Sequence, residues 1–425
     1  MIALLILLLL ILLDYFIGMR PARLVAASES PAPIVSENPV KASVVVLAMG
    51  LEESPAEYIE MMLRQDYPDF ELILVCDSNA ETASMYAEAF ADKPNVHITF
   101  LPPGSRRLSR RKLALTIGIK RASGDVVVTT STGVRPLSDS WLTAILAPFN
   151  SEDSSAAAAS MGVIALNPED FGGAHGKTLI FNHQYDTLQW LGAALGNKPT
   201  RCDGFNLAFR RELFFELKGY ASSLLYVDGD DDIFLQDLHA YGQCVPIVND
   251  SSLMVTDWGE DSERILTEYR EQYLFTRRFL PKASYLRSAF SSWCRWLAIP
   301  AALIPILNGI EILISIFCGG APALRQAIDS AEDICGRIFF SLPANTMPEI
   351  AEAILLICLS LILLTAYFLI TIKVFSKASM RISPSGRISG AAMIPLRLLS
   401  RPIRNFIFRE RHRSAFSNHF TYTHS

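Results

Sequence analysis

Ser43-Val44-Val45-Val46-Leu47-Ala48 is a short run of β-branched and aliphatic residues, which is the composition of a strand buried on both faces. Three later runs have the same character: 71–75, 97–101 and 126–130. Residues 55–63 and 112–122, which lie between these runs, have helical spacing. Because short apolar strands alternate with helices, the sequence predicts an α/β domain with a mostly parallel sheet and helices on both faces.

Polar residues follow two of the predicted strands directly. Asp77 comes just after the second strand, and Ser131, Thr132 and Gly133 come just after the fourth. Ligands of such sheets bind beyond the carboxyl ends of the strands. We therefore expect Asp77 and residues 131–133 to line a cleft.

Four carboxylates fall within five positions in Asp228-Gly229-Asp230-Asp231-Asp232-Ile233-Phe234, directly before an apolar run with helical spacing. One interpretation is a helix cap, because aspartate is favourable at the positive end of a helix. The other is chemical: the cluster holds a cation, or one carboxyl acts as a general base. Since neighbouring carboxylates repel each other, the chemical interpretation needs support from the surrounding sequence.

The amino-terminal end is strongly apolar. Residues 2–13 are aliphatic, and the run extends to about residue 17, long enough for a short membrane span. A signal peptide is the rival interpretation, but Arg20 and Arg23 follow the run and no basic residue precedes it. This asymmetry favours an uncleaved anchor with residue 20 onward in the cytoplasm.

Two more apolar stretches, 296–317 and 353–372, are long enough to span a membrane. The loop at 319–352 holds five acidic and two basic residues, whereas residues 373–413 hold ten Lys or Arg and one Glu. The positive-inside rule then places the loop outside and the tail in the cytoplasm. We expect a multi-pass protein of the inner (cytoplasmic) membrane. The expected parts are an anchor at 1–18, a linker at 19–42, an α/β domain at 43–290, spans at 296–317 and 353–372, a non-cytoplasmic loop at 319–352, and a basic cytoplasmic tail at 373–425.

Within the tail, residues 394–408 alternate apolar side chains with Arg397, Arg401 and Arg404. One interpretation is an amphipathic helix lying on anionic membrane lipids. The other is a helix packed against the α/β domain. Pro402 is expected to kink or divide this helix.

Composition excludes other classes of protein. The 425-residue chain is half hydrophobic and carries a net charge of −5, which is not the signature of a nucleic-acid-binding protein. Its seven cysteines show no paired spacing, so neither a zinc site nor a disulfide framework is indicated.

Five motifs in order resemble the family 2 glycosyltransferases that are anchored in membranes. They span about residues 40–280 and are the strand at 43–48, the segment Arg64–Val75 ending at Asp77-Ser78, the segment Lys112–Asp125, the segment Gly204–Arg211 with Gly219-Tyr220, and Gly229–Leu235. The resemblance implies a GT-A fold for residues 43–290. It also implies transfer of a sugar from a nucleotide-diphosphate donor to a lipid-linked or membrane-proximal glycan acceptor.

The resemblance also implies roles for single residues. Asp231 matches the general base, with Asp230 beside it. On the donor side, Asp77 matches the residue that contacts the nucleoside base, Lys112 matches a lysine near the diphosphate, and residues 131–133 stand at the usual metal motif. On the acceptor side, matching residues are Gly204, Asn206 and Gln272.

Three departures from the family pattern stand out. Ser131-Thr132-Gly133 replaces the Asp-x-Asp that would hold Mg²⁺ or Mn²⁺, so the expected metal ligands are absent. The first strand lacks the usual Arg-Asn-Glu. Of the Gln-x-x-Arg-Trp motif only Gln272 is present, because Phe275 and Thr276 occupy the last two places, although Arg277 and Arg278 follow.

These departures leave two main hypotheses. In the first, the enzyme is active, and the diphosphate is neutralised by Lys112 together with four nearby arginines, with a metal held within 228–232 as a further contribution. The arginines are Arg106, Arg107, Arg110 and Arg111. In the second, the protein is a pseudo-glycosyltransferase that serves as a binding or assembly subunit. A hydrolase or phosphotransferase built on the acidic cluster is a weaker third, because no nucleophile motif accompanies it.

Overall fold

The computed structural model describes residues 2–28, 38–48, 55–77, 80–102, 109–151, 156–223, 226–318, 349–383 and 393–411. Its contacts divide the chain into two compact units, each built from segments that are distant in the sequence. We call 1–20, 286–374 and 392–402 the helical unit, and 21–285, 375–391 and 403–425 the sheet unit.

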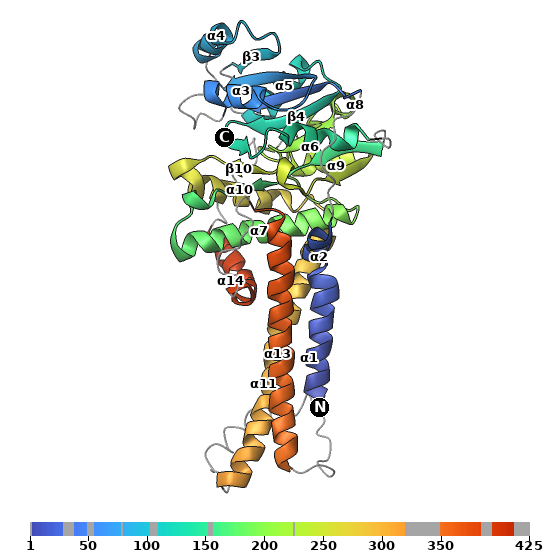
Figure 1. The fold of residues 1–425 in the computed structure, drawn as a ribbon, viewed down its shortest axis with the longest axis vertical. Coiled ribbons are helices and arrows are strands. Elements are labelled where there is room, and N and C mark those ends of the chain that lie inside the picture. Colours follow the sequence, from blue (N-terminus) through green and yellow to red (C-terminus); the bar gives the residue numbers. More distant parts are fainter. Residues whose placement is uncertain are drawn as a thin grey trace, which may run out of the picture. The chain divides into compact units, whose positions relative to one another are not determined.

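The sheet unit contains a seven-stranded sheet with the order β3-β2-β1-β4-β8-β6-β9 and a three-stranded sheet with the order β5-β10-β7 (Figure 1). The strands are β1 Ala42–Leu47, β2 Phe70–Asp77, β3 Val96–Leu101, β4 Val126–Ser131, β5 Val134–Pro136, β6 Ala157–Met161, β7 Ile164–Ala165, β8 Leu207–Arg210, β9 Gln243–Pro246 and β10 Met254–Thr256. In the large sheet, β3, β2, β1 and β4 are mutually parallel and β6 pairs in parallel with β9, whereas β8 is antiparallel to both its neighbours. The predicted mostly parallel sheet is confirmed.

The sheet unit also contains helices, several of which pack on this sheet. They are α2 Arg20–Ala27, α3 Pro55–Leu63, α4 Ala80–Ala89, α5 Arg110–Arg121, α6 Trp141–Leu146, α7 Gly173–Leu195, α8 Arg211–Glu216, α9 Asp232–His239 and α10 Ser262–Thr276. Every residue of β1 and β4 is buried, which requires cover on both faces of the sheet. This explains why both strands read as continuous apolar runs rather than as alternating patterns.

The region predicted to be a linker contains a helix. Residues 19–42 were predicted to be a linker, of which residues 26–42 are rich in Ala, Ser and Pro, but Arg20–Ala27 form α2. Pro21, Ala22, Val25 and Ala26 are buried. A Cβ on Gly192 of α7 would lie 2.3 Å from Pro21 Cα, so this glycine allows α2 and α7 to pack closely. The linker expectation was wrong for α2, because tertiary packing outweighed composition; residues 29–37 lie outside the described part of the chain.

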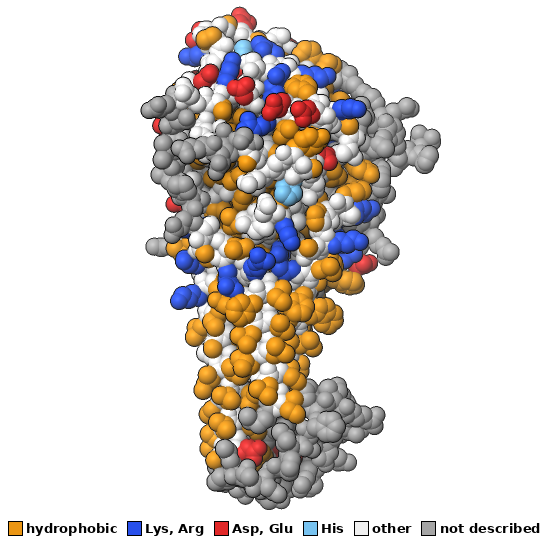
Figure 2. Space-filling model, turned by 90° about the vertical axis from the view of Figure 1, so that its right-hand side faces the viewer, with side chains coloured by type: hydrophobic (Ala, Val, Ile, Leu, Met, Phe, Trp, Pro, Cys, Tyr) orange, Lys and Arg blue, Asp and Glu red, His pale blue; other side chains and the backbone are white. Residues whose placement is uncertain are grey.

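The helical unit is formed from long apolar helices. They are α1 Ile2–Leu13, its π-helical continuation Asp14–Gly18, α11 Lys282–Cys318, α13 Glu349–Met380 and the first half of α14 Ile394–Arg411. Tyr285–Ile314 and Ala351–Met380 are long and apolar enough to cross a membrane, and a third span results if the bent helices at the amino terminus count as one. Figure 2 shows hydrophobic side chains covering the visible face of these helices. Residues 319–348, most of the predicted external loop, lie outside the described part of the chain.

A charged network is buried inside the helical unit. Asp14, in the π-helical turn, is 0% exposed. Its carboxylate accepts hydrogen bonds from Arg295 Nε at 3.0 Å, from Tyr367 OH at 2.6 Å and from Ser291 Oγ. A Cβ on Gly18 would lie only 2.0 Å from Asp14 Oδ1, so glycine is required for this arrangement. The network joins the amino-terminal helix to α11 and α13.

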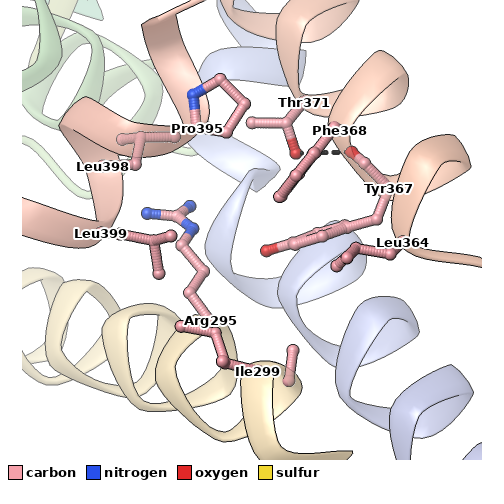
Figure 3. Close-up of a pocket in the computed structure, with 10 residues that line it drawn as sticks. Arg295, Ile299, Leu364, Tyr367, Phe368, Thr371, Pro395, Leu398 and Leu399 are labelled. Atoms are coloured by element: carbon pink, nitrogen blue, oxygen red, sulfur yellow. Dashed lines mark hydrogen bonds between the residues drawn. The ribbon is translucent and has the colours of Figure 1, made fainter. Parts of the chain in front are cut away.

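Next to this network is a small pocket (Figure 3). Arg295 and Tyr367 contribute polar groups to it, while Pro395, Leu398 and Leu399 of α14 form part of its apolar wall. Leu398 is buried, so the first half of α14 is packed within the helical unit.

Helix α14 fits parts of both interpretations made from the sequence. In the sheet unit, Arg404 Nη2 donates to Asn182 Oδ1 of α7 at 3.2 Å, and Arg270 of α10 lies 4.0 Å from the centre of the Phe408 ring. Ile403, Phe406 and Ile407 nevertheless remain 44–61% exposed. The second half of α14 is therefore packed on the α/β domain and still presents an apolar strip. The helix continues through Pro402, which does not divide it.

Candidate functional site

The acidic cluster opens helix α9 and is buried. Asp228, Asp230, Asp231 and Asp232 are each at most 8% exposed. Gly229 has a φ of +98°, which an L-residue rarely adopts, so glycine permits the turn that gathers these carboxylates. Asp231 is the N-cap residue, and its Oδ1 accepts from Asp232 N at 2.6 Å. The segment thus has the geometry of a helix cap while it concentrates negative charge.

Arg111 of α5 is shared by two of the carboxylates. Its Nε lies 2.5 Å from Asp230 Oδ2, and its Nη2 donates to Asp231 Oδ2 at 3.3 Å. The guanidinium also lies 4.7 Å from the centre of the Phe205 ring. Asp231 and Arg111 can approach the backbone this closely because residue 204 is glycine. A Cβ at this position would lie 2.7 Å from Asp231 Cβ and 3.4 Å from Arg111 Nη2. Gly204, predicted on the acceptor side, is therefore in contact with the predicted base.

Lys112 is placed differently from Arg111. Its Nζ donates to the carbonyl oxygens of Ser223, Tyr226 and Asp228 at 2.5, 2.9 and 2.7 Å, and the residue is 2% exposed. Burial lowers the pKa of Lys112 to about 8, against the opposing effect of the nearby carboxylates. All three donors of the ammonium group are engaged, so Lys112 holds the backbone that leads into the acidic cluster.

The last carboxylate of the cluster has partners of its own. Asp232 Oδ2 accepts from Thr276 Oγ1 of α10 at 2.9 Å, and its Oδ1 lies 3.6 Å from Arg201 Nε. The Arg201 guanidinium lies 5.1 Å and 4.4 Å from the ring centres of Tyr269 and Tyr273. Asp232 therefore connects the acidic cluster to α10.

Burial changes the protonation of the cluster. Burial raises the pKa of Asp230 to about 6, although Arg111 opposes this shift. Burial, with the neighbouring Asp231 charge, raises the pKa of Asp232 well above its usual range, against Arg201 and the Thr276 hydrogen bond. Raised carboxyl pKa values beside a partly accessible guanidinium are typical of functional sites.

The predicted donor residues lie at the carboxyl edge of the sheet. Asp77 ends β2 and Ser131 ends β4, on either side of β1. Ser131 is 1% exposed, and its hydroxyl has no hydrogen-bond partner among the described residues. Thr132 N donates to Leu47 O at 3.0 Å, and Gly133 O accepts from Asp257 N at 2.9 Å.

The two other predicted acceptor residues are Asn206 and Gln272. Asn206 is fully buried: its Nδ2 donates to Val163 O and Ser252 O, and its Oδ1 accepts from Trp141 Nε1. These bonds occupy both ends of the amide, so the geometry is that of a structural connector. Gln272 is half-buried on α10.

The described residues do not fit a divalent cation. Mg²⁺ and Mn²⁺ need several charged oxygen ligands. At the end of β4 the chain has a buried hydroxyl in place of a carboxylate, and Asp230, Asp231 and Asp232 already face guanidinium groups. In the described part of the chain, no group of three or more His, Cys, Asp or Glu side chains is arranged for a metal ion.

Sequence reasoning missed the α10 side of the site. Phe275 and Thr276 occupy the places of the Arg-Trp pair of the motif. Thr276 Oγ1 nevertheless donates a hydrogen bond to Asp232, and the ring centres of Phe275 and Tyr226 are 5.5 Å apart. The arginine beside α10 is Arg201, three residues before Gly204, and no sequence motif marks it. Arg277 and Arg278 instead lie over Tyr285 and Phe275. Arg106, Arg107 and the side chain of Asp77 lie outside what the structure describes.

The arrangement combines a carboxylate at a helix N-terminus, a guanidinium and a strand edge. A carboxylate so placed can accept a proton from a hydroxyl, and a guanidinium can bind an anionic oxygen.

The chain is similar to several solved structures. Among solved structures, the chain is similar to the mannosyltransferase PcManGT from Pyrobaculum calidifontis in complex with GDP-Man and Mn²⁺ (17% identity, TM-score 0.46, 84% of this chain and 99% of that one). It is also similar to glucosyl-3-phosphoglycerate synthase from Mycobacterium tuberculosis, with 16% identity, a TM-score of 0.36, and coverage of 57% of this chain and 81% of that one. A third similar structure is S. aureus TarS, with 14% identity, a TM-score of 0.36, and coverage of 60% of this chain and 42% of that one. No curated protein sequence matches the chain.

Residues 6–318 match the model of glycosyl transferase family 21, which is most of the chain. The match is to family 21, whereas the sequence resemblance was to family 2, and it confirms the predicted glycosyltransferase class. The chain belongs to glycosyl transferase family 21.

Proposed function

We propose that this protein is a membrane-anchored glycosyltransferase that uses Asp231 as its general base. The observation that carries the proposal is the position of Asp231. Its carboxylate lies at the N-terminus of α9, in contact with Gly204 and hydrogen-bonded to Arg111. Thr129 Oγ1 of β4 donates to Gly204 O at 2.7 Å, so this group is close to the carboxyl end of the sheet.

In the proposed reaction, an acceptor hydroxyl attacks the anomeric carbon of a nucleotide-diphosphate sugar. The new bond joins the acceptor oxygen to that carbon, while the bond between the carbon and the diphosphate oxygen breaks. Asp231 takes the hydroxyl proton, and the nucleoside diphosphate leaves with the bonding electrons. General-base catalysis of this kind contributes roughly 10²–10⁴-fold to a rate.

The donor is proposed to bind where β2 and β4 end. Asp77 is assigned to the nucleoside base, and Ser131, Thr132 and Gly133 to the floor beneath the diphosphate. Lys112 acts through the backbone of Ser223, Tyr226 and Asp228 rather than by direct contact, because the carbonyls of these three residues engage its ammonium group. On the acceptor side we retain Gly204 and Gln272, and Asn206 acts as a positioning residue for the segment that carries Gly204.

The acceptor is proposed to be a lipid-linked or membrane-proximal glycan, and the catalytic side to be cytoplasmic. Two helices of membrane-spanning length and apolarity support membrane association. The basic residues of the tail support a multi-pass topology with the sheet unit in the cytoplasm. The exposed apolar strip of α14, flanked by arginines, supports contact with anionic membrane lipids.

One observation favours a second candidate, a pseudo-glycosyltransferase that binds without turnover. The chain has Ser131 and Gly133 where the family pattern has metal-binding aspartates. The same fold and membrane helices would then serve an assembly partner.

The test uses the full chain purified in detergent. It is incubated with UDP-glucose, UDP-N-acetylglucosamine and GDP-mannose, with and without vesicles of total polar lipids, and release of nucleoside diphosphate is measured. The proposal expects release that depends on the lipid vesicles for at least one donor. Binding of a donor without release under every condition would reject the enzyme and favour the pseudo-glycosyltransferase.

A further inference from the structure

We propose that the Arg111 guanidinium, and not a divalent cation, binds the diphosphate of the donor. The inference rests on the proposed function, because it concerns the nucleoside diphosphate part of the same substrate. The inference identifies the group that neutralises the negative charge of the diphosphate. Of the four arginines named from the sequence, it assigns direct contact with the diphosphate to Arg111.

Arg111 is correctly placed for this role. It is the second residue of α5, whose N-terminus carries a positive partial charge that favours anions. Its Nη2 would be 3.4 Å from a Cβ on Gly204, and Gly204 O accepts from Thr129 of β4. Thr129 is two residues before Ser131, where the metal-binding motif would begin. The guanidinium is therefore beside the strand end at which a diphosphate would need a cation.

Arg111 also has binding capacity left. Its side chain is 23% exposed, and the ion pairs use Nε and Nη2. Among the residues that the structure describes, none accepts a hydrogen bond from Nη1. A guanidinium has five N–H donors in a planar fork that matches phosphate oxygens, so the remaining edge suits a diphosphate.

The other described cations near the cluster are engaged elsewhere. Lys112 is fully occupied by carbonyls, and Arg201 lies between two tyrosine rings with its side chain 12% exposed. Arg110 Nη2 donates to Leu101 O and Pro102 O. Of these four residues, Arg111 has a side chain that is 23% exposed and pairs with the acidic cluster, and its guanidinium lies against Gly204, which is hydrogen-bonded to β4.

Asp230 gives the site a way to accept the anion. Its carboxylate lies 2.5 Å from Arg111 Nε and has a pKa raised to about 6 by burial. The charged and titratable groups around it are Arg111 and Lys112 of α5, Asp228 and Asp231 of its own segment, and Tyr220 after α8. Protonation of Asp230 removes one negative charge next to Arg111. An anionic ligand would favour that protonation, so binding should take up a proton.

The sign of the pH dependence separates this site from a metal site. If Arg111 binds the diphosphate, affinity rises as the pH falls through about 6, because Asp230 becomes neutral. If carboxylates held a metal that bound the diphosphate, affinity would fall over the same range, because metal ligands must be deprotonated.

The experiment measures binding of UDP-glucose, GDP-mannose, ADP-glucose, CDP-glucose and dTDP-glucose, whose diphosphates have no group that titrates near pH 6, to the full chain in detergent by calorimetry, in EDTA and in MnCl₂, roughly one unit below and above the pKa of Asp230. We expect at least one of these nucleoside-diphosphate sugars to bind equally well in EDTA and in Mn²⁺, and more tightly at the lower pH. Arg111→Gln should weaken that binding by roughly tenfold or more, the effect of losing a charge-assisted hydrogen bond. Arg121→Gln, at the other end of α5, is the matched control and should change affinity less than about twofold.

Two further variants guard against misfolding of Arg111→Gln. Arg111→Lys keeps the charge and should retain part of the affinity. Asp230→Asn should tighten binding at the higher pH and remove the pH dependence. Loss of binding in EDTA with recovery in Mn²⁺, unchanged affinity of Arg111→Gln, or no binding by any of the five nucleoside-diphosphate sugars would each overturn the inference. Binding without turnover of sugar nucleotides would leave it intact and reject only the proposed enzyme activity.

Discussion

Two of the buried arginine–aspartate arrangements among the described residues differ in how completely they are closed. In the helical unit, Asp14 is 0% exposed and its two carboxylate oxygens accept from Arg295, Tyr367 and Ser291. In the sheet unit, Arg111 is divided between Asp230 and Asp231 and remains partly exposed. The first arrangement is closed to solvent and draws its hydrogen-bond donors from α11 and α13, so it joins helices. The second keeps N–H groups and a carboxylate available to a substrate, so it can perform chemistry.

Breaking the closed arrangement should have the largest effect on stability. Asp14→Leu leaves the Arg295 charge without its carboxylate in an apolar helical unit, and removing one partner of a buried pair costs about 3–5 kcal/mol. Thermal unfolding in detergent should register the loss. The double variant Asp14→Leu/Arg295→Met removes both charges and should recover most of the stability. If the single and double variants unfold alike, the ion pair is not what joins these helices.

A single methyl group tests the open arrangement without changing any charge. In Gly204→Ala the new Cβ would lie 2.7 Å from Asp231 Cβ, so Asp231 and Arg111 must move. Misplacement of a reacting group by about 1 Å can cost roughly 10²-fold in rate, so turnover should fall by that order while the melting temperature changes little. Gly172→Ala is the control, because a Cβ there meets nothing within 4 Å. Equal turnover of the two variants would count against the position assigned to Asp231.

The smallest effect is expected at a third carboxylate, which is structural like Asp14. Burial opposes ionisation of Glu71, but hydrogen bonds from Ser43 and Ser123 and the proximity of His97 leave its pKa lowered. Since the folded pKa lies below the ordinary value of 4.5, the contribution to stability is present above that pH and is lost as the pH falls.

Glu71→Gln should therefore lower stability by about 1–2 kcal/mol at neutral pH and by less in acid, as measured by denaturant unfolding at several pH values. A loss that is independent of pH would show that shape rather than charge matters at Glu71. Asp230 should contribute to stability with the opposite pH dependence. Because burial raises its pKa, its contribution is present in acid and is lost as the pH rises.

The parts of the fold that sequence predicts well are those in which local pattern and burial agree. β1 and β4 are short runs of valine and similar residues, buried along their whole length, and periodicity is sufficient to find them. The strand β6, Ala157–Met161, was not predicted, because a run of alanines has no β preference. It is a strand because it fills the gap between β8 and β9, which only the assembled sheet provides.

In the candidate site, too, local sequence pattern predicts some features, and others arise only in the folded chain. Four carboxylates in five positions identify the acidic cluster from sequence, and Gly229 marks the turn within it. The cations that neutralise the cluster could not be assigned, because Arg111 and Arg201 reach it from distant segments. Thr276 was interpreted as the loss of a motif residue, whereas in the folded chain it binds Asp232.

The comparison of the two arrangements is tested most directly by two variants measured together. Asp231→Asn and Asp14→Asn each neutralise one buried aspartate, and both are assayed for release of nucleoside diphosphate from sugar nucleotides and for melting temperature. We predict that Asp231→Asn reduces the release rate by roughly 10²-fold or more with little change in melting temperature, whereas Asp14→Asn chiefly lowers the melting temperature. Undiminished release by Asp231→Asn would contradict the assignment of Asp231 as the general base.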